Sequence, residues 1–296
     1  MREAFKMSMN KTITVEPEYP FSIGEAFVAS KTITVDLPTD ESIKEISIRH
    51  VIGTLTGGAG GTAPIANTLL TNIKMYVGGV LTEDWVGAIN VDEEPLGPDA
   101  LRVYNRHSNG IEPLDDQWDL NFPLPLPSGQ TKVLQYTFNT IGNIQAGSHT
   151  AYDGKISIYL RKTKQKFGKS AVRTLRNGKL TIGTATSQTL FLDPIKGAAK
   201  AIALIICTED NGGAPSNSIL DNVTIKDLNN ILFDSKFTQL QSKAQTESRV
   251  ACKTGWAIVK LGGRQFGANQ IKIDITCVAG TAKFLHWWIV CIQPSG

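Results

Sequence analysis

The chain has 296 residues, of which 41% are hydrophobic and 19% are charged, and its formal net charge is +3. This composition is that of an ordinary globular protein and excludes a disordered or fibrous chain. At this length one hydrophobic core usually divides into two, so two domains are expected. No stretch reaches the roughly 18 apolar residues of a membrane span, and no apolar segment follows the basic N-terminal residues, so neither an anchor nor a secretory signal is expected.

The first half of the sequence predicts a series of short strands. Residues 31–36 alternate between polar and apolar side chains, which is the pattern of a half-buried strand. Similar runs predict strands at 43–51, 72–77, 133–138 and 155–160, with Gly, Pro, Asn and Asp clusters between them. Residues 98–107 differ, because Pro98 at the start and Gly110 beyond the end favour a helix.

The second half follows the same plan. Strands are predicted at 189–192, 201–207, 257–261, 270–277 and 283–291. Within the last of these, residues 287–290 are apolar throughout, which suits a strand that is covered on both faces. A helix is predicted over 237–248, since Phe237, Leu240 and Ala244 fall on one helical face.

Blocks of the two halves match in order and spacing. The pairs are Ser30–Pro38 with Ser187–Pro194, Ile46–Ile52 with Ile202–Ile206, Gly60–Ile73 with Gly212–Val223, and Gly154–Leu160 with Lys283–Ile289. For the blocks before the last pair, the offset stays between 150 and 157 residues. This regularity indicates a duplication, and each unit, with about eight short strands and one helix, suits a two-sheet sandwich of the jelly-roll type.

Residues that could carry chemistry are scattered. His50, His107, His149 and His286 show no metal-ligand spacing, and the most apolar surroundings place His286 inside the protein. Cys207, Cys252, Cys277 and Cys291 form no CxxC pair and are expected to be buried free thiols, although one disulfide stays open. We therefore predict no catalytic residue, no metal site and no cofactor.

The distribution of charge is uneven. Eight basic residues and no acidic ones lie between positions 161 and 179: Arg161, Lys162, Lys164, Lys166, Lys169, Arg173, Arg176 and Lys179. Two interpretations stay open, a solvated linker between the repeats or a contact with the phosphates of nucleic acid or lipid headgroups.

Two tandem jelly rolls, each with a late helix and joined by a short linker, resemble the double jelly-roll major capsid proteins of tailless, membrane-containing icosahedral viruses. The resemblance rests on the paired blocks and covers about residues 21–296. It implies an N-terminal arm at 1–20, jelly rolls at 21–163 and 183–296, and a basic linker at 164–182.

The resemblance also implies a function, that of a structural protein without enzymatic activity. Homotrimers with six similar barrels would tile an icosahedral shell, in a virion assembled in the host cytoplasm. Expected partners are other copies of the chain, penton and spike proteins, and internal membrane lipid or the genome, with Arg2, Lys6 and Lys11 of the arm pointing inward.

Two other functions stay open. A carbohydrate- or receptor-binding sandwich would need exposed aromatic side chains, for which Trp85, Trp118 and Trp256 are the candidates. An enzyme related to double jelly-roll amidases would need converging acidic side chains between the barrels, and the sequence offers no such set.

Overall fold

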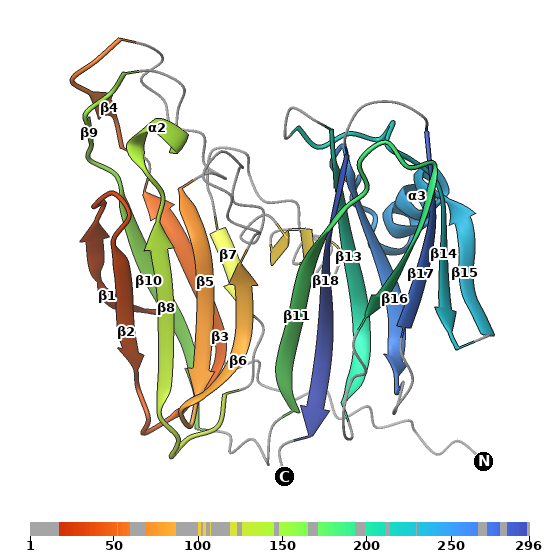
Figure 1. Cartoon of the computed structure of the whole chain (residues 1–296). Coiled ribbons are helices and arrows are strands. Elements are labelled where there is room, and N and C mark those ends of the chain that lie inside the picture. Colours follow the sequence, from red (N-terminus) through yellow and green to blue (C-terminus); the bar gives the residue numbers. More distant parts are fainter. Residues whose placement is uncertain are drawn as a thin grey trace, which may run out of the picture.

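The computed structural model describes residues 18–51, 53–59, 69–86, 100–101, 103–104, 107, 119–122, 126–144, 148–164, 171–192, 199–210, 214–228, 230–265, 271–278 and 283–294. Antiparallel strands dominate these residues and form two groups of sheets side by side, one from each half of the chain (Figure 1). This confirms the predicted all-β class.

The first half contains two four-stranded sheets. Its main strands are β1 (Glu18–Ala26), β2 (Thr32–Leu37), β3 (Ser42–Val51), β5 (Leu70–Val77), β6 (Val80–Val86), β7 (Asp119–Phe122), β8 (Lys132–Phe138) and β10 (Lys155–Thr163). The sheet orders are β1-β10-β3-β7 and β2-β8-β5-β6. A small sheet of β4 (Leu55–Thr56) with β9 (Ala151–Tyr152), and the short helix α2 (Ile141–Ile144), lie at one end (Figure 1).

The second half also contains two four-stranded sheets. Its strands are β11 (Ala171–Thr181), β12 (Ser187–Leu192), β13 (Lys200–Glu209), β14 (Leu220–Asp227), β15 (Asn230–Lys236), β16 (Trp256–Arg264), β17 (Ile271–Cys277) and β18 (Phe284–Pro294). The orders are β11-β18-β13-β16 and β12-β17-β14-β15, which match those of the first half strand for strand. The paired sequence blocks accordingly lie in strands that occupy equivalent places.

Both predicted helices are present where the structure describes them. Positions 100, 101, 103, 104 and 107 are helical, and α3 (Phe237–Ser248) has the predicted bounds with Phe237, Leu240 and Ala244 buried. α3 ends at Ser248 because Arg249 adopts a left-handed conformation (φ 62°) and its N–H bonds to Gln245 O at 2.7 Å.

The expected basic linker at 164–182 is wrong over most of its length. Residues 171–181 form β11, which pairs with β18 along its full length from Ala171↔Pro294 to Thr181↔Phe284. The segment forms a strand despite its basic side chains, because the hydrogen bonds to the apolar strand β18 are made by the backbone and do not involve those side chains. Only residues 164–170 separate β10 from β11.

Each half buries alternate residues of its strands between its two sheets. In β8, Leu134, Tyr136 and Phe138 point inward, as Ile271, Ile273 and Ile275 do in β17. Lys132 ends the inward row of β8, where its buried ammonium donates to Pro38 O at 3.0 Å. Burial lowers the pKa of Lys132 against the opposing charge of Asp40.

Candidate assembly interface

The β11-β18-β13-β16 sheet of the second half is apolar on both faces. On the face away from its own sandwich it buries Ala203, Ile205, Cys207, Trp256, Ile258, Trp288 and Val290. The indole rings of Trp256 and Trp288 stack with centroids 5.5 Å apart. These side chains form one continuous apolar cluster with the core of the first half. The prediction of a last strand covered on both faces is thus confirmed.

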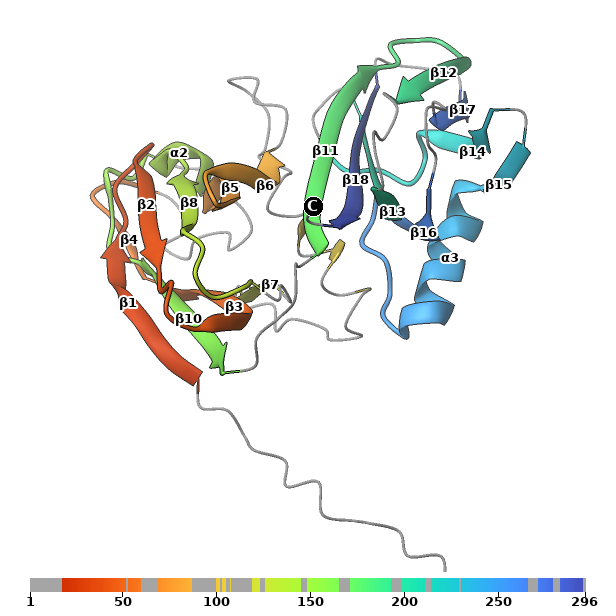
Figure 2. The same ribbon diagram turned by 90° about the horizontal axis from the view of Figure 1, so that it is seen from below.

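The first half covers this face with β6 and with the helical residues between positions 100 and 107, which lie between the halves (Figure 2). Ala100, Leu101, Val103 and Tyr104 are all buried. The rings of Tyr104 and Trp85 lie 6.1 Å apart, and Asn177 Nδ2 of β11 donates to Asp84 O of β6 at 3.2 Å. We call this contact between unlike surfaces of the two halves the seam.

A buried polar pair on β13 and β18 lies next to the apolar residues of this face. His286 Nε2 lies 2.6 Å from Glu209 Oε2, with the two side chains 2% and 1% exposed. The imidazole also stacks on Trp288, at 6.3 Å between centroids and 16° between planes. The prediction that His286 lies inside is confirmed. The contact provides a partner for His286 Nε2 and Glu209 Oε2, whereas the other carboxyl oxygen of Glu209 is buried without a hydrogen bond.

The equivalent face of the first half is polar and open. On β10, Ser157 and Tyr159 correspond to His286 and Trp288 of β18 in the paired blocks. Ser47, Ser157, Tyr159 and Arg161 are partly exposed there, and Lys155 is exposed. The outer face of this sheet is therefore apolar in the second half, where the first half covers it. In the first half the equivalent face is polar and is left accessible by the described residues.

Two aspartates show the same asymmetry at the strand edges. Asp84 on β6 and Asp234 on β15 hold equivalent positions, opposite Lys74 and Thr224. Burial raises the pKa of Asp84 despite the opposing charge of Lys74. Hydrogen bonds from Asn222 and Thr224 hold the pKa of the exposed Asp234 below its usual value. The β6 edge is thus covered by the second half, while the β15 edge faces solvent.

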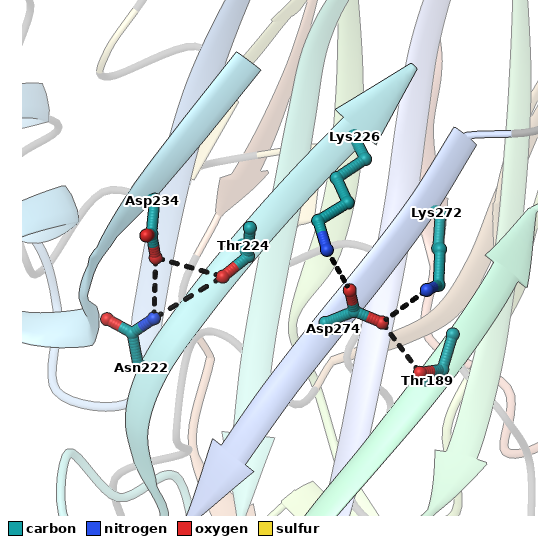
Figure 3. Close-up of polar contacts among 7 residues, drawn as sticks. All are labelled: Thr189, Asn222, Thr224, Lys226, Asp234, Lys272 and Asp274. Carbon is teal, nitrogen blue, oxygen red and sulfur yellow. Dashed lines mark hydrogen bonds and ion pairs between the residues drawn. The ribbon is translucent and has the colours of Figure 1, made fainter. Parts of the chain in front are cut away.

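A polar network covers the outer face of the β12-β17-β14-β15 sheet (Figure 3). Asp274 accepts from Thr189 Oγ1 at 2.6 Å and from Lys226 Nζ at 2.8 Å, and Lys272 Nζ lies 3.3 Å away. Although burial acts to raise the pKa of Asp274, these donors and the Lys226 charge lower it to about 2. The network makes this face polar, unlike the seam.

Acid should weaken this network before the rest of the fold. The depressed pKa of Asp274 means that its contribution to stability is present above its unfolded pKa of about 3.9 and is lost as the pH falls toward 2. We expect Asp274→Asn to lose less unfolding free energy than the wild type between pH 4 and pH 2 in urea titrations. Asp221→Asn, at an exposed site outside the network, is the control. Parallel pH dependence of wild type and Asp274→Asn would contradict this role.

The basic residues singled out in the sequence do not form one patch. Arg161, Lys162 and Lys164 lie where β10 ends, and Lys162 pairs with Glu41 at 3.3 Å. Lys179 lies toward the far end of β11, with its ammonium 4.0 Å from the Phe284 ring centroid. Arg173 and Arg176 are on β11, but their side chains lie outside the described part, as do Arg2, Lys6, Lys11, Lys166 and Lys169 altogether.

Exposed apolar side chains gather at the end of both sandwiches where β10 stops and β11 starts, which we call the linker end (lower end of Figure 1). Among the residues whose exposure the structure describes, five of the seven large exposed apolar side chains are there: Val80, Leu81, Phe191, Leu228 and Ile231. The β14–β15 turn even holds Leu228 at a φ of 53°, where the equivalent β5–β6 turn uses Gly78 at 59°. Leu228 is 57% exposed in this left-handed conformation, which a residue with a Cβ adopts at some energetic cost.

Other kinds of site receive little support. Trp85 and Trp256, two candidates for a sugar-binding platform, are each 1% exposed, and Trp118 lies outside the described residues. No group of His, Cys, Asp and Glu in the described ranges could hold a metal ion. None of the helices described here is long and apolar enough to span a membrane. Cys207, Cys277 and Cys291 are buried free thiols as predicted, whereas Cys252 is partly exposed.

Comparison with solved structures identifies the fold. No family model and no curated relative matches the sequence. The major capsid protein of bacteriophage PM2 matches with a TM-score of 0.65 at 12% identity, covering 95% of this chain and 99% of that one. The MCP of STIV gives 0.71 at 13% identity over 94% and 97%, and the PBCV-1 virus capsid gives 0.59 at 11% over 94% of both chains. The chain has the fold of these capsid proteins, as the resemblance predicted.

Proposed function

We propose that this chain is a structural virion protein, a major capsid protein that associates with copies of itself into an icosahedral shell. The observation that carries the proposal is the likeness to viral capsid proteins, which extends over nearly the whole of both chains. The proposal gives the chain no catalytic role. It would be located in the virion and assembled in the host cytoplasm, with penton and spike proteins as further partners.

Each half is proposed to be an eight-stranded jelly roll, the first from Glu18 to Thr163 and the second from Ala171 to Pro294. One support is that the two halves have identical sheet orders. Another is the place of the helix, which comes after the hairpin β5–β6 in the first half and after the equivalent hairpin β14–β15 in the second. The two jelly rolls stand side by side with their linker ends pointing the same way (Figure 1).

The seam supports a trimer as the building block. It joins the β6 edge and the described helical positions 100, 101, 103 and 104 of the first half to the outer face of the β11-β18-β13-β16 sheet. The equivalent β15 edge and the polar face of α3 in the second half are exposed, as is the outer face of β10 in the first. A contact between unlike surfaces forms a ring when its rotation closes and an open filament when it does not, and the proposal is the closed form. Three chains, with six similar barrels, would complete such a ring.

Light scattering on the purified chain, followed by negative-stain imaging, tests this assembly. We expect a mass three times the 32.1 kDa of one chain, with hexagonal outlines. Tyr159→Ala, on the open face of β10, should weaken the trimer at least tenfold while leaving the monomer folded. Tyr76→Ala removes a partly exposed tyrosine from the outer face of the other sheet and is the control. A folded monomer at all concentrations would refute the proposal.

We further propose that the linker end meets polyanions, either lipid headgroups or genome phosphates, through Lys162, Lys164 and the basic residues between them and β11. The exposed apolar side chains at the same end support a lipid surface. Arg173, Arg176 and the arm residues Arg2, Lys6 and Lys11 are candidates for the same contact. Lys179, over the Phe284 ring at the far end of β11, is not.

Replacing Lys162, Lys164, Lys166 and Lys169 by Gln tests this contact. Each basic residue near an anionic surface contributes about 1 kcal/mol, so binding to anionic vesicles at low salt should fall at least tenfold. Lys179→Gln should have little effect. Parallel assays with vesicles and with nucleic acid separate the two polyanions, and unchanged binding to both would refute the contact.

A further inference from the structure

A cysteine, a histidine and a serine from both halves meet at the seam. His107 belongs to the helical segment of the first half, Ser248 ends α3, and Cys252 follows α3. His107 Nδ1 lies 2.7 Å from Ser248 Oγ, and His107 Nε2 lies 3.5 Å from Cys252 Sγ. The imidazole and the hydroxyl are buried, whereas Cys252 is partly exposed. The thiol is therefore the member of this group that solvent can reach.

The serine hydroxyl determines which nitrogen of His107 carries the proton. Ser248 Oγ donates its single hydrogen to Ala244 O, at 2.7 Å. Toward His107 the same oxygen must then accept, so Nδ1 is the protonated nitrogen of the neutral ring. Nε2 keeps a lone pair, and this lone pair faces Cys252 Sγ. The arrangement is that of a thiol nucleophile beside a base, with a third group orienting the base.

We propose that Cys252 is an activated thiol and a modification site for small soft electrophiles and low-molecular-weight disulfides. Its proton passes to His107 Nε2, and the resulting thiolate is the reactive form. With a small disulfide, the thiolate attacks one sulfur, the S–S bond of the reagent breaks, and the other sulfur leaves as a thiolate that takes the proton from His107. Cys252 is oxidised to a mixed disulfide while half of the reagent is reduced.

The other three cysteines are less accessible to reagents than Cys252, so the reaction should be selective for Cys252. Cys207 and Cys291 are 0% exposed and Cys277 is 6% exposed. Burial raises the pKa of Cys277, although the Lys283 charge opposes this. All three thiols lack the access that reaction requires, and the raised pKa of Cys277 also disfavours its thiolate.

The location of the site couples its chemistry to the seam. Cys252 and His107 are separated by 145 positions in sequence and belong to different halves. The pair therefore exists only while the halves are docked. A group attached to Sγ would occupy the space between the thiol and His107, so modification weakens the contact between the halves.

Alkylation of the native full-length chain by iodoacetamide tests the site, with each cysteine followed by peptide mass spectrometry at pH 6.5 and pH 9.5. An ordinary thiol with a pKa of about 8.5 reacts roughly a hundredfold more slowly at the lower pH. Cys252 should react at similar rates at both pH values, and at pH 6.5 at least tenfold faster than the other three cysteines. Cys252→Ser should abolish the fast labelling.

His107→Gln should restore the hundredfold dependence on pH, and Ser248→Ala should restore part of it, since Ser248 acts by positioning the imidazole. The ratio of the two rates cancels the accessibility of the thiol, but loosening of the seam would also separate His107 from Cys252. The ratio in the wild type, where the seam is intact, is therefore the decisive result. A hundredfold ratio already present in the wild type, or an unchanged ratio in His107→Gln, would overturn the proposal.

Discussion

Trp288→Ala should lower the free energy of unfolding by about 3–5 kcal/mol, the range for removing a fully buried aromatic side chain. Trp288 is 1% exposed, stacks on Trp256 and lies at the centre of the apolar cluster that joins the two halves. The cavity would open between the sandwiches, where neither sheet can collapse without moving a whole half. Urea unfolding followed by circular dichroism measures the loss.

Tyr159→Ala is the matched control, because Tyr159 holds the equivalent position on β10 but is partly exposed. Its cost should stay within about 1 kcal/mol for the monomer. Equal losses in the two variants would contradict the prediction, because burial of Trp288 in the seam would then add nothing to the free energy of unfolding.

His286→Leu is expected to cost about 3–5 kcal/mol, because it leaves the Glu209 carboxyl buried without its hydrogen-bonded partner. The size of the effect comes from the group left behind and not from the attraction within the pair. Thermal and urea unfolding of the variant at neutral pH provide the measurement.

The double variant Glu209→Leu/His286→Leu separates these two contributions. Removing both polar groups together should recover most of the stability lost in His286→Leu, since two leucines can pack against Trp288. If the loss in the double variant equalled the sum of the losses in the two single variants, His286 and Glu209 would not be energetically coupled, and the prediction would be wrong.

Most strands could be predicted from the sequence, because they depend on local alternation of side chains, and the matched blocks predicted that the two halves share one plan. The matched blocks lie in equivalent strands, and α3 has the predicted bounds. β11 was missed because its basic residues suggested a linker, and its strand character comes from pairing with β18, more than 100 positions away.

The interface was less accessible to sequence analysis. The apolar run at 287–290 indicated a strand with two covered faces, but nothing local showed what covers the second face. His107 and Cys252 were only two among scattered histidines and cysteines, and their contact depends on how the halves dock. The basic residues of 161–179 were grouped by sequence, whereas an extended strand separates Arg161 from Lys179.

The difference between the apolar seam and the polar face of β10 has a consequence for the history of the molecule. Before a duplicated gene is fused, a ring of single barrels has identical contacts, and each must be soluble when open. When two barrels are joined in one chain, each barrel meets its tethered neighbour at a high effective concentration, so the contact between them stays formed in the folded chain. In the proposed trimer, only the tethered contacts would have been free to accumulate tryptophans such as Trp256 and Trp288, while the contacts between chains would have stayed reversible. Fusion would thereby have converted a sixfold set of equal contacts into alternating permanent and separable ones.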